Sequence, residues 1–407
     1  MNILYILQQS IYTSTNPPKW RTADSNIQMM RGIIDQLTRH TDWKFYILIA
    51  PLADFDDLKD YKELVDHPNV RFINYDFPVD AFWNRQHFDI FGFSAVWDLL
   101  PEIDVVWNNI TELSRNIKTF LYFKKSKAKL VTCCYWLDCP EIGQEKVDKA
   151  ISYDWRQIDG FECSDLAVFT CKSTLDAFWS NAMQKVNSKY VLNIRDKSVI
   201  WDFGYSQIEM NSDRNYYPLY KKTISFLNRM SGINYTHHLE FIEAVNKLAE
   251  KRSDFQVIFT NPSQKISWDW IENNVKNLYI PTKDFTRKDY LTLLWCSDIT
   301  VHLFEKELYG GCAHRESVHC GNIVITPKCA EYLNIQGEDY PFYTDINTDL
   351  VDVLDRALDK IPIYDKYSVR CATASPEFRA IQERNKQSSF EVVKDRVIQD
   401  LERIVNA

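Results

Sequence analysis

The chain alternates short apolar runs with segments of helical spacing, and this alternation occurs twice along its 407 residues. In the first half, apolar runs predict strands at residues 2–8, 43–50, 70–75, 103–107, 129–134, 165–170 and 198–201. Amphipathic segments lie between several of these runs, beginning with a helix predicted at residues 25–38. Strand, loop and helix in repeated succession build a parallel sheet covered by helices. The first half therefore predicts an α/β domain.

The same pattern restarts after residues 202–218, whose Gly, Asn, Ser and Pro predict an interdomain linker. Strands are predicted at residues 223–227, 255–260, 278–280, 299–303 and 323–326, and helices at residues 235–252, 286–296 and 312–320. Residues 375–406 predict a helical segment interrupted near residues 387–389. The predicted organisation is one domain at residues 1–210, a second at 211–375, and a helical segment at 376–407 that returns toward the first.

Composition argues against several classes of protein. Hydrophobic residues make up 45% of the chain and charged residues 26%, as in ordinary soluble proteins. The formal net charge of −8 argues against a globally basic nucleic-acid binder. The ten cysteines form no CxxC pair, so we expect reduced structural thiols and no metal site. No apolar run approaches the roughly 18 residues that span a bilayer, and the start lacks signal-peptide features, so a cytoplasmic protein is expected.

Residues 305–327 carry the clearest candidate site. Gly310 and Gly311 precede the predicted helix, Glu307 lies before the glycines, and Glu316 lies within the helix. Backbone amides at a helix start bind anions such as phosphate, and carboxylates accept hydrogen bonds from sugar hydroxyls. The pattern therefore predicts a nucleotide-sugar pocket. A Gly-Gly turn before an ordinary amphipathic helix is the alternative. The Walker and GxGxxG patterns are absent, which disfavours ATP hydrolysis and dinucleotide binding.

Two further residues of the second domain could serve a phosphate. Arg229 follows the first predicted strand of that domain, and His237 lies near the start of the next helix. An arginine at this sheet edge would stabilise the negative charge of a diphosphate leaving group. A surface salt bridge for Arg229 and a partly exposed position for His237 are the alternatives.

Two polar segments follow predicted strands of the first domain. The loop after the first strand contains Lys19, Trp20 and Arg21, which could hold a phosphate and stack on a ring. Trp136 and Asp138 follow the strand at residues 129–134, and a carboxylate beside aromatic rings is a candidate general base. A surface excursion and a simple turn are the respective alternatives.

The second half resembles the donor domain of GT-B glycosyltransferases, in the retaining family with paired glutamates. The family loop reads roughly E-x-F-G, followed by a helix of the form E-A-x-x-x-G-x-P-V. The matching residues here are Glu307, Tyr309, Gly310, Glu316, Ser317, Gly321, Ile323 and Val324. The resemblance implies an α/β GT-B fold, with two Rossmann-like, doubly wound domains facing across a cleft and a C-terminal helix crossing back. The first domain would bind the acceptor and the second the nucleotide-sugar donor.

The resemblance also implies roles for single residues. Glu307 would meet the transferred sugar, Glu316 the nucleotide ribose and Arg229 the diphosphate. Two departures bear on this. Eight residues separate the glutamates instead of seven, and the lysine normally found after the arginine is replaced by Asn234, His237 or His238.

The implied reaction moves a sugar from a nucleotide diphosphate sugar, UDP-linked in the leading interpretation, to an acceptor hydroxyl, without a metal or a further cofactor. Asp138 would orient or deprotonate the hydroxyl, and the glutamate pair favours retention. The expected donor-site residues are Arg229, Gly232, His237, Ile280, Gly310, Gly311 and Glu316.

A narrower similarity is to the phage enzymes that put glucose on hydroxymethylcytosine in DNA. It rests on an N-R-x-x-G segment at residues 228–232, a Tyr-x-x-Asp segment at 135–138, and an approximate Q-x-S-S-F segment at 386–390. The first-ranked acceptor is therefore hydroxymethylcytosine in phage DNA, with the host cytoplasm as the location. Candidate stacking and phosphate contacts are Trp20, Trp83, Trp136, Lys19, Arg21, Lys124, Lys125, Lys127 and Lys129.

Three alternatives remain open at the sequence level. A cell-envelope glycan or lipid-linked sugar is the second acceptor class. A nucleotide-sugar epimerase or hydrolase and a non-catalytic GT-B-like binding subunit are the other functional classes. The sequence indicates no oligomeric state.

Overall fold

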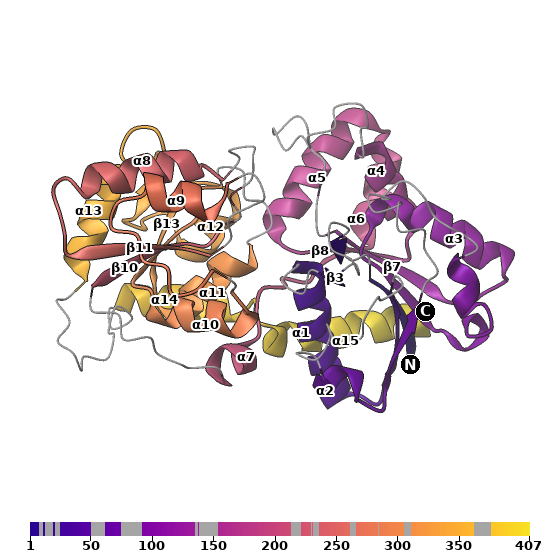
Figure 1. Cartoon of the computed structure of the whole chain (residues 1–407). Helices are drawn as coiled ribbons and strands as arrows, with labels where there is room; N and C mark the ends of the chain where they lie inside the picture. The colour runs from indigo at the N-terminus through magenta and orange to yellow at the C-terminus, as the bar shows by residue number, and fades with distance from the viewer. Residues whose placement is uncertain are drawn as a thin grey trace. The chain divides into compact units, whose positions relative to one another are not determined.

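The structure is a computed structural model in which two compact units are distinguished. It describes residues 1–7, 11–12, 19–20, 25–49, 62–74, 92–134, 137, 154–212, 221–228, 230, 236–260, 266–283, 285–304, 311–361 and 376–407. The N-terminal unit comprises Met1–Phe203 and Phe390–Ala407, and the C-terminal unit comprises Gly204–Ser389. Each unit is an α/β layer structure with its own sheet (Figure 1).

The N-terminal unit is built on a seven-stranded parallel sheet in the order β5-β4-β1-β6-β7-β8-β9. Its strands are β1 (Asn2–Ile6), β4 (Lys44–Ile49), β5 (Val70–Asn74), β6 (Val105–Asn108), β7 (Lys129–Cys134), β8 (Leu166–Phe169) and β9 (Ser198–Ile200). A short antiparallel pair, β2 (Ile11–Tyr12) with β3 (Lys19–Trp20), lies outside this sheet. The central strands are fully buried, as expected for apolar runs covered on both faces. The seven predicted strands of this half are confirmed.

The helices of the N-terminal unit follow its strands. They are α1 (Ser25–His40), α2 (Lys62–Val65), α3 (Ser114–Phe123), α4 (Asp154–Cys163), α5 (Lys172–Lys185), α6 (Ser188–Asp196) and α15 (Phe390–Asn406), with the short 3-10 turns η3 (Gly92–Val96), η4 (Leu100–Glu102) and η5 (Thr111–Leu113). Helix α5 begins at Lys172, directly after its N-cap Cys171.

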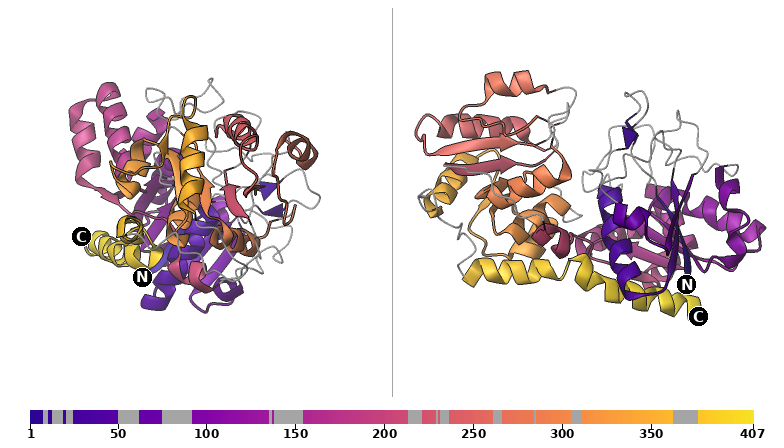
Figure 2. Two further views of the ribbon diagram at one scale, coloured as in Figure 1. Left: turned by 90° about the vertical axis from the view of Figure 1, so that its left-hand side faces the viewer. Right: turned by 60° about the horizontal axis from the view of Figure 1, so that its bottom comes forward.

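The last helix belongs to the N-terminal unit although it ends the chain. Helix α15 buries Phe390, Val393, Val397 and Leu401, a helical spacing that forms one apolar face. It packs beside α1, where a side chain added at Gly32 would collide with the Phe390 ring (Figure 2). Trp201 Nε1 also donates to Asp400 Oδ2 at 2.9 Å. The predicted helix break near residues 387–389 is confirmed, because α14 (Pro376–Lys386) ends there and α15 begins at Phe390.

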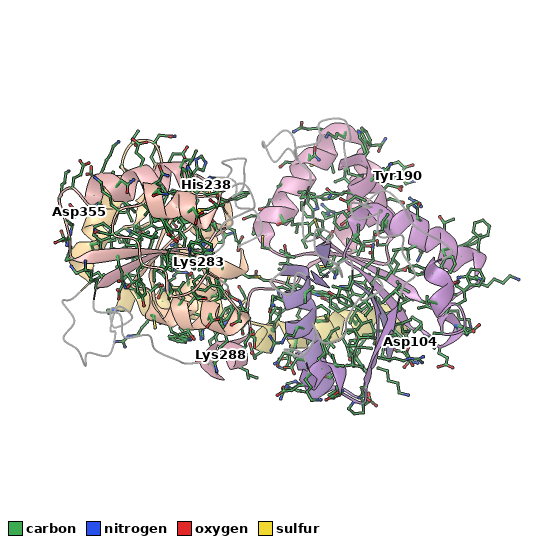
Figure 3. All side chains as sticks on the ribbon, in the orientation of Figure 1. Asp104, Tyr190, His238, Lys283, Lys288 and Asp355 are labelled. Carbon is green, nitrogen blue, oxygen red and sulfur yellow. The ribbon has the colours of Figure 1, made fainter. Side chains whose placement is uncertain are left out.

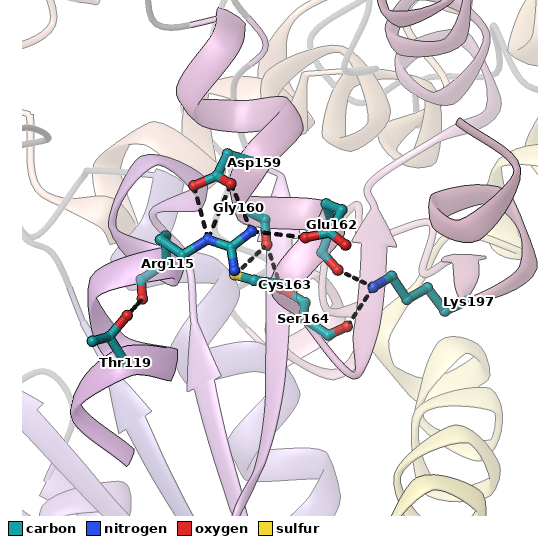
Figure 4. A network of polar contacts seen from close by, with 8 residues as sticks. All are labelled: Arg115, Thr119, Asp159, Gly160, Glu162, Cys163, Ser164 and Lys197. Atoms are coloured by element: carbon teal, nitrogen blue, oxygen red, sulfur yellow. Dashed lines mark hydrogen bonds and ion pairs between the residues drawn. The ribbon is translucent and has the colours of Figure 1, made fainter. Parts of the chain in front are cut away.

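A polar network ties α3 to α4 in the same unit (Figure 4). Arg115 Nη2 lies 2.6 Å from Asp159 Oδ1 and 2.7 Å from Glu162 Oε2, and Lys197 donates to the carbonyl of Ser164 at 2.7 Å. Burial raises the pKa of the neighbouring Cys163 thiol to about 11. The Arg115 side chain is 45% exposed, so its ion pairs stabilise the unit only modestly.

The C-terminal unit has a five-stranded parallel sheet in the order β11-β10-β12-β13-β14. Its strands are β10 (Lys222–Phe226), β11 (Phe255–Phe259), β12 (Ile299–Val301), β13 (Ile323–Pro327) and β14 (Tyr343–Thr344). Its helices are α7 (Gln207–Ser212), α8 (His238–Leu248), α9 (Trp268–Asn274), α10 (Arg287–Cys296), α11 (Cys312–Cys320), α12 (Ala330–Gln336), α13 (Leu350–Lys360) and α14. Helices α8 and α13 pack together on one face, and α10, α11 and α14 cover the other (Figure 1).

One prediction for the C-terminal unit is wrong, and the predicted linker contains a helix. Residues 278–280 form no strand, because only Leu278 makes an isolated bridge to Val257 after Asn277 adopts a positive φ of 55°. The predicted linker contains helix α7, which buries Met210 and accepts a hydrogen bond from Trp295 Nε1 at the Met210 carbonyl. The segment after Phe203 is thus packed into this unit.

Arg315 anchors the end of the C-terminal unit. Its guanidinium is fully buried, lies 3.0 Å from Glu331 Oε1 and donates to the hydroxyl of Ser388. Asn385 donates to the Arg315 carbonyl at 2.8 Å. Gly204 touches the same side chain, and an added Cβ there would lie 2.6 Å from Arg315 Cδ. Only glycine fits at that position.

Candidate functional site

The C-terminal sheet has a switch point between β10 and β12. From β10 the chain first adds β11 on one side and later β12 on the other. In open parallel sheets, ligands bind outside the carboxyl ends of the strands at such a point. Asn228 follows β10 and His302 follows β12, and these neighbouring strands pair in parallel at Phe226 and Val301. The two polar residues therefore flank the expected ligand position.

A buried chain of polar contacts begins at Asn228. Its Oδ1 lies 3.3 Å from His302 Nδ1, and His302 Nε2 lies 3.2 Å from Ser317 Oγ on α11. Burial lowers the pKa of His302 to about 3, so this imidazole is neutral at pH 7. The Ser317 hydroxyl gives its one hydrogen to the Ala313 carbonyl at 2.7 Å, so Nε2 of the neutral imidazole donates to Ser317 Oγ and Nδ1 accepts from the Asn228 amide, turned so that its nitrogen faces His302. The outer atom of the Asn228 amide is buried and has no partner among the described residues.

Helix α11 begins at the same sheet edge, since it leads into β13 and runs antiparallel to the strands. Its N-cap is Gly311, which supplies no side-chain cap to the amides of the first turn. Its C-cap is Gly321, with a left-handed φ of 79° that favours glycine. The predicted helix at residues 312–320 is confirmed, and an uncapped helix start is a potential anion site.

His314 lies in the first turn of α11 and is 1% exposed. Its ring packs 5.8 Å from the ring of His302 and 4.7 Å from that of Tyr332. Neither of its ring nitrogens has a hydrogen-bond partner among the described residues. Burial, followed by the neighbouring His302 and Arg315, lowers the pKa of His314 well below its ordinary value, so the imidazole is neutral.

Glu316 lies one residue beyond Arg315 on α11 and is 3% exposed. Its Oε1 accepts from Arg287 Nη2 at 2.5 Å, and the same nitrogen lies 2.9 Å from Glu209 Oε2. Arg287 is the first residue of α10, whose N-cap Thr286 and Asp289 form a capping box. One guanidinium therefore joins α7, α10 and α11.

The charge of Glu316 acts on its neighbours. Burial and then the Glu316 charge raise the pKa of Tyr290 well above its ordinary value and that of the Cys312 thiol to about 12. The charges of Glu316 and Glu209 oppose the cost of burying Arg287, whose pKa stays well above its ordinary value. The site beneath α11 therefore holds an ionised Arg–Glu cluster with neutral phenol and thiol groups around it.

Comparison with known proteins indicates the fold. No protein-family model matches the chain, and no curated protein matches its sequence. Among solved structures, the trehalose-6-phosphate synthase OtsA is similar with a TM-score of 0.67 at 12% identity, over 99% of both chains. The N-terminal domain of Candida albicans trehalose-6-phosphate phosphatase has a TM-score of 0.68 at 14% identity, over 99% of this chain and 97% of that one. Anabaena Alr3699/HepE in complex with UDP and glucose has a TM-score of 0.65 at 12% identity, over 99% of this chain and 100% of that one.

The chain has a GT-B fold. The predicted fold class is confirmed, and identities of this size indicate the fold alone. The candidate site of this GT-B chain lies at the switch point of the second sheet. It consists of three side-chain groups: the pair Asn228 and His302, the single residue His314, and the pair Glu316 and Arg287.

Four of the predicted donor residues are described, and topology brings them to the carboxyl edge of the C-terminal sheet. Gly311 and Glu316 share α11, and His237 is the N-cap of α8, which follows β10. Ile280 follows the parallel bridge between Leu278 and Val257 and is half-buried. The roles of these four residues remain predictions.

The other predicted residues cannot be assessed in the same way. Those that lie outside the described residues are Arg21, Trp136, Asp138, Arg229, Gly232, Glu307 and Gly310. For Lys19 and Trp20 only the backbone of β3 is described. Lys124 Nζ, one of the expected phosphate contacts, lies 3.5 Å from the centre of the Trp97 ring at the end of α3.

Neither described histidine that replaces the family lysine supplies a free cation. His238, labelled in Figure 3, is 2% exposed, and burial lowers its pKa, so it is neutral at pH 7. His237 has a positive φ of 52°, and its Nδ1 lies 3.5 Å from Glu240 Oε1.

The site contains residues that the sequence predictions missed. They are Glu209, Asn228, Arg287, His302 and His314. For Glu209 a signal existed: Ser206 and Glu209 form the S-x-x-E pattern of a helix start, and the Glu209 amide donates to Ser206 Oγ at 3.1 Å. For Asn228 and His302 the signal is their position directly after neighbouring strands.

The described residues contain neither a candidate metal cluster nor a helix that could span a membrane. No group of three or more His, Cys, Asp or Glu side chains there could hold a metal ion. No helix in the described ranges is long and apolar enough to cross a bilayer. The described cysteines are free thiols.

Proposed function

We propose that this chain is a glycosyltransferase that moves a sugar from a nucleotide diphosphate sugar to an acceptor hydroxyl. The observation that carries the proposal is the buried carboxylate of Glu316 on α11, which pairs with Arg287. Helix α11 starts at the sheet switch point, and its N-cap Gly311 supplies no side-chain cap. A nucleoside diphosphate offers hydroxyls that a carboxylate can accept and phosphates that helix-start amides can bind. The GT-B fold supports the same proposal, because HepE of this fold was solved with UDP and glucose.

In the proposed reaction the bond between the anomeric carbon and the diphosphate oxygen breaks, and a bond from that carbon to the acceptor oxygen forms. The nucleoside diphosphate leaves with the bonding electron pair, and the acceptor proton passes to Asp138. Arg229 and the amides at Gly310 and Gly311 would stabilise the growing negative charge. Glu307 would contact the sugar, and no metal is required.

The remaining proposed contacts divide between donor and acceptor. Gly232, His237 and Ile280 complete the donor site, which takes UDP-linked sugars in the leading proposal. Lys19, Trp20, Arg21 and Trp136 hold the acceptor. The paired glutamates favour retention of anomeric configuration.

For the acceptor we propose hydroxymethylcytosine in DNA. The support is limited to the three short sequence segments at residues 135–138, 228–232 and 386–390. A glycan or lipid-linked sugar of the cell envelope is the alternative that the experiment must separate.

The test is a panel of UDP-, GDP- and ADP-linked sugars, incubated with the full chain and with hydroxymethylated DNA, plain DNA or envelope glycan extracts. Mass spectrometry of nucleosides and glycans shows where a sugar has been added. A hexose or pentose on hydroxymethylcytosine is the expected result. Transfer only to glycans would replace the acceptor, and donor consumption without any transfer would indicate a hydrolase or epimerase.

The proposed ribose contact has its own test. If Glu316 accepts hydrogen bonds from ribose hydroxyls, UDP should bind about tenfold more tightly than 2′-deoxy-UDP, and Glu316→Gln should reduce this preference. Glu250→Gln, in an ion pair with Lys276 at an exposed surface, is the matched control. An unchanged preference in Glu316→Gln would exclude the ribose role.

A further inference from the structure

At the switch point of the C-terminal sheet, two side chains carry buried polar atoms that bind nothing in the described part of the protein. One is the outer atom of the Asn228 amide, two residues after β10. The other is His314, whose two ring nitrogens are both without a partner at 1% exposure. A buried polar group left unpaired destabilises the folded protein, so each such group in a native structure requires an explanation.

The position of His314 places its ring at the ligand-binding edge. Residue 314 lies in the first turn of α11, and its ring stands perpendicular to that of His302, which directly follows β12. Ser317, on the same face of α11 one turn later, contacts His302 at 3.2 Å. The face of α11 that carries His314 therefore looks onto the carboxyl ends of β10 and β12, beside the uncapped helix start.

The neighbouring polar groups do not satisfy either residue. His302 uses one nitrogen toward the Asn228 amide and the other toward Ser317, so its own two contacts are complete. Tyr332 offers its ring to His314 at 4.7 Å, a contact that an apolar side chain would make equally well. Packing alone therefore does not explain a histidine at position 314.

The chemistry of the unpaired groups selects the ligand. The outer atom of the Asn228 amide needs one hydrogen-bond partner, whereas a neutral imidazole donates through one nitrogen and accepts through the other. A fully ionised phosphate has no hydrogen to give to the accepting nitrogen. Sugar hydroxyls both donate and accept, so two of them can satisfy the two nitrogens of the imidazole.

We infer that His314 and Asn228 bind hydroxyls of the sugar carried by the nucleotide donor and so determine which sugar is accepted. This inference rests on the proposed function and names the part of the donor that the switch-point residues recognise. His302 acts as a positioning residue, because its Nδ1 contacts the Asn228 amide at 3.3 Å and so fixes the orientation of that amide.

The test compares sugar-free and sugar-bearing ligands. Wild type, His314→Phe and Asn228→Ala, each as the full chain, are titrated by calorimetry at pH 7.5 with UDP, GDP and ADP and with the glucose-linked form of each. His319→Phe is the matched control, since His319 lies at the other end of α11 and packs against Tyr205 at 4.9 Å. We expect His314→Phe and Asn228→Ala each to weaken binding of the glucose-linked form about tenfold and to leave the free nucleoside diphosphate within twofold.

The outcomes separate the inference from the function beneath it. Equal weakening of both ligand forms would move these contacts to the nucleoside diphosphate and overturn the sugar assignment. Unchanged binding of both forms would overturn the inference alone. A wild-type protein that binds none of the six ligands would contradict the proposed function itself.

Protein stability supplies an independent readout. Since His314 has no hydrogen bond to lose, ligand-free His314→Phe should unfold at the same or a higher denaturant concentration than wild type. A clear loss of stability would indicate a structural role and contradict the inference. If His314→Phe does not fold, Asn228→Ala carries the binding test, because it leaves α11 unchanged.

Discussion

Arg287 Nη2 lies 2.5 Å from Oε1 of Glu316, and this contact joins the start of α10 to the buried face of α11. The Arg287 side chain is 21% exposed and that of Glu316 only 4%. The same nitrogen lies 2.9 Å from Glu209, so one cation serves two largely buried carboxylates. Removing the cation leaves both charges without their partner.

Arg287→Gln is therefore expected to lower the free energy of unfolding by about 3–5 kcal/mol. The double variant Arg287→Gln with Glu316→Gln should recover part of this loss, because it removes one of the stranded charges. Urea unfolding of the four proteins in the cycle measures both effects. Lys276→Gln breaks an exposed pair of 3.1 Å and is the control, with an expected loss of less than about 1 kcal/mol. An Arg287→Gln loss no larger than that of the control would contradict a buried, stabilising pair.

A second prediction concerns pH and the two neutral histidines at the switch point. Burial holds the pKa of His302 at about 3 and that of His314 well below its ordinary value. In the unfolded chain both residues take up a proton below about pH 6.5, so the unfolded state binds more protons and stability falls as the pH decreases. Each histidine should contribute a loss of about 1 kcal/mol between pH 7.5 and pH 5.5.

The measurement is the free energy of unfolding of wild type and His314→Phe at these two pH values. The pH-dependent loss should be smaller by about 1 kcal/mol in the variant. The same substitution at the exposed His40 is expected to leave the wild-type pH dependence in place. Equal losses in wild type and His314→Phe would mean that His314 is protonated in the folded protein.

A third prediction tests the end of α11. Gly321 has a φ of 79°, which side chains with a Cβ rarely adopt, and its amide donates to the Val318 carbonyl at 3.0 Å. Gly321→Ala should destabilise the protein by about 1 kcal/mol, and Gly321→Asn by less, because asparagine tolerates the left-handed region. Thermal unfolding of both variants gives the comparison. Equal thermal stability of Gly321→Ala and wild type would contradict a left-handed conformation at residue 321.

The alternation of strand and helix was predictable because it depends on local patterns. Apolar runs and helical spacing located the buried strands and α11, and the polar Gln387–Ser388–Ser389 sequence located the break before α15. The strand predicted at residues 278–280 is absent from the structure, because an apolar triplet does not determine how many of its residues pair with a neighbouring strand. In the structure only Leu278 bridges Val257.

The site was less predictable because its contacts join residues that are far apart in the chain. Asn228, His302 and Ser317 meet only through the parallel pairing of β10 with β12 and the return of α11 onto their ends. The partner of Glu316 could not be read from its own motif either, since Arg287 lies on another helix. Glu209 was overlooked because composition suggested a linker, although its S-x-x-E pattern signals a helix start.

The most direct test of the central claim is release of nucleoside diphosphate from a nucleotide sugar, measured for the full chain with and without the acceptor mixtures. We predict that release is slow alone and rises at least about tenfold when an acceptor hydroxyl is present, with one sugar transferred for each nucleotide released. Release at the same rate without an acceptor, or no release from any nucleotide sugar, would contradict a glycosyltransferase.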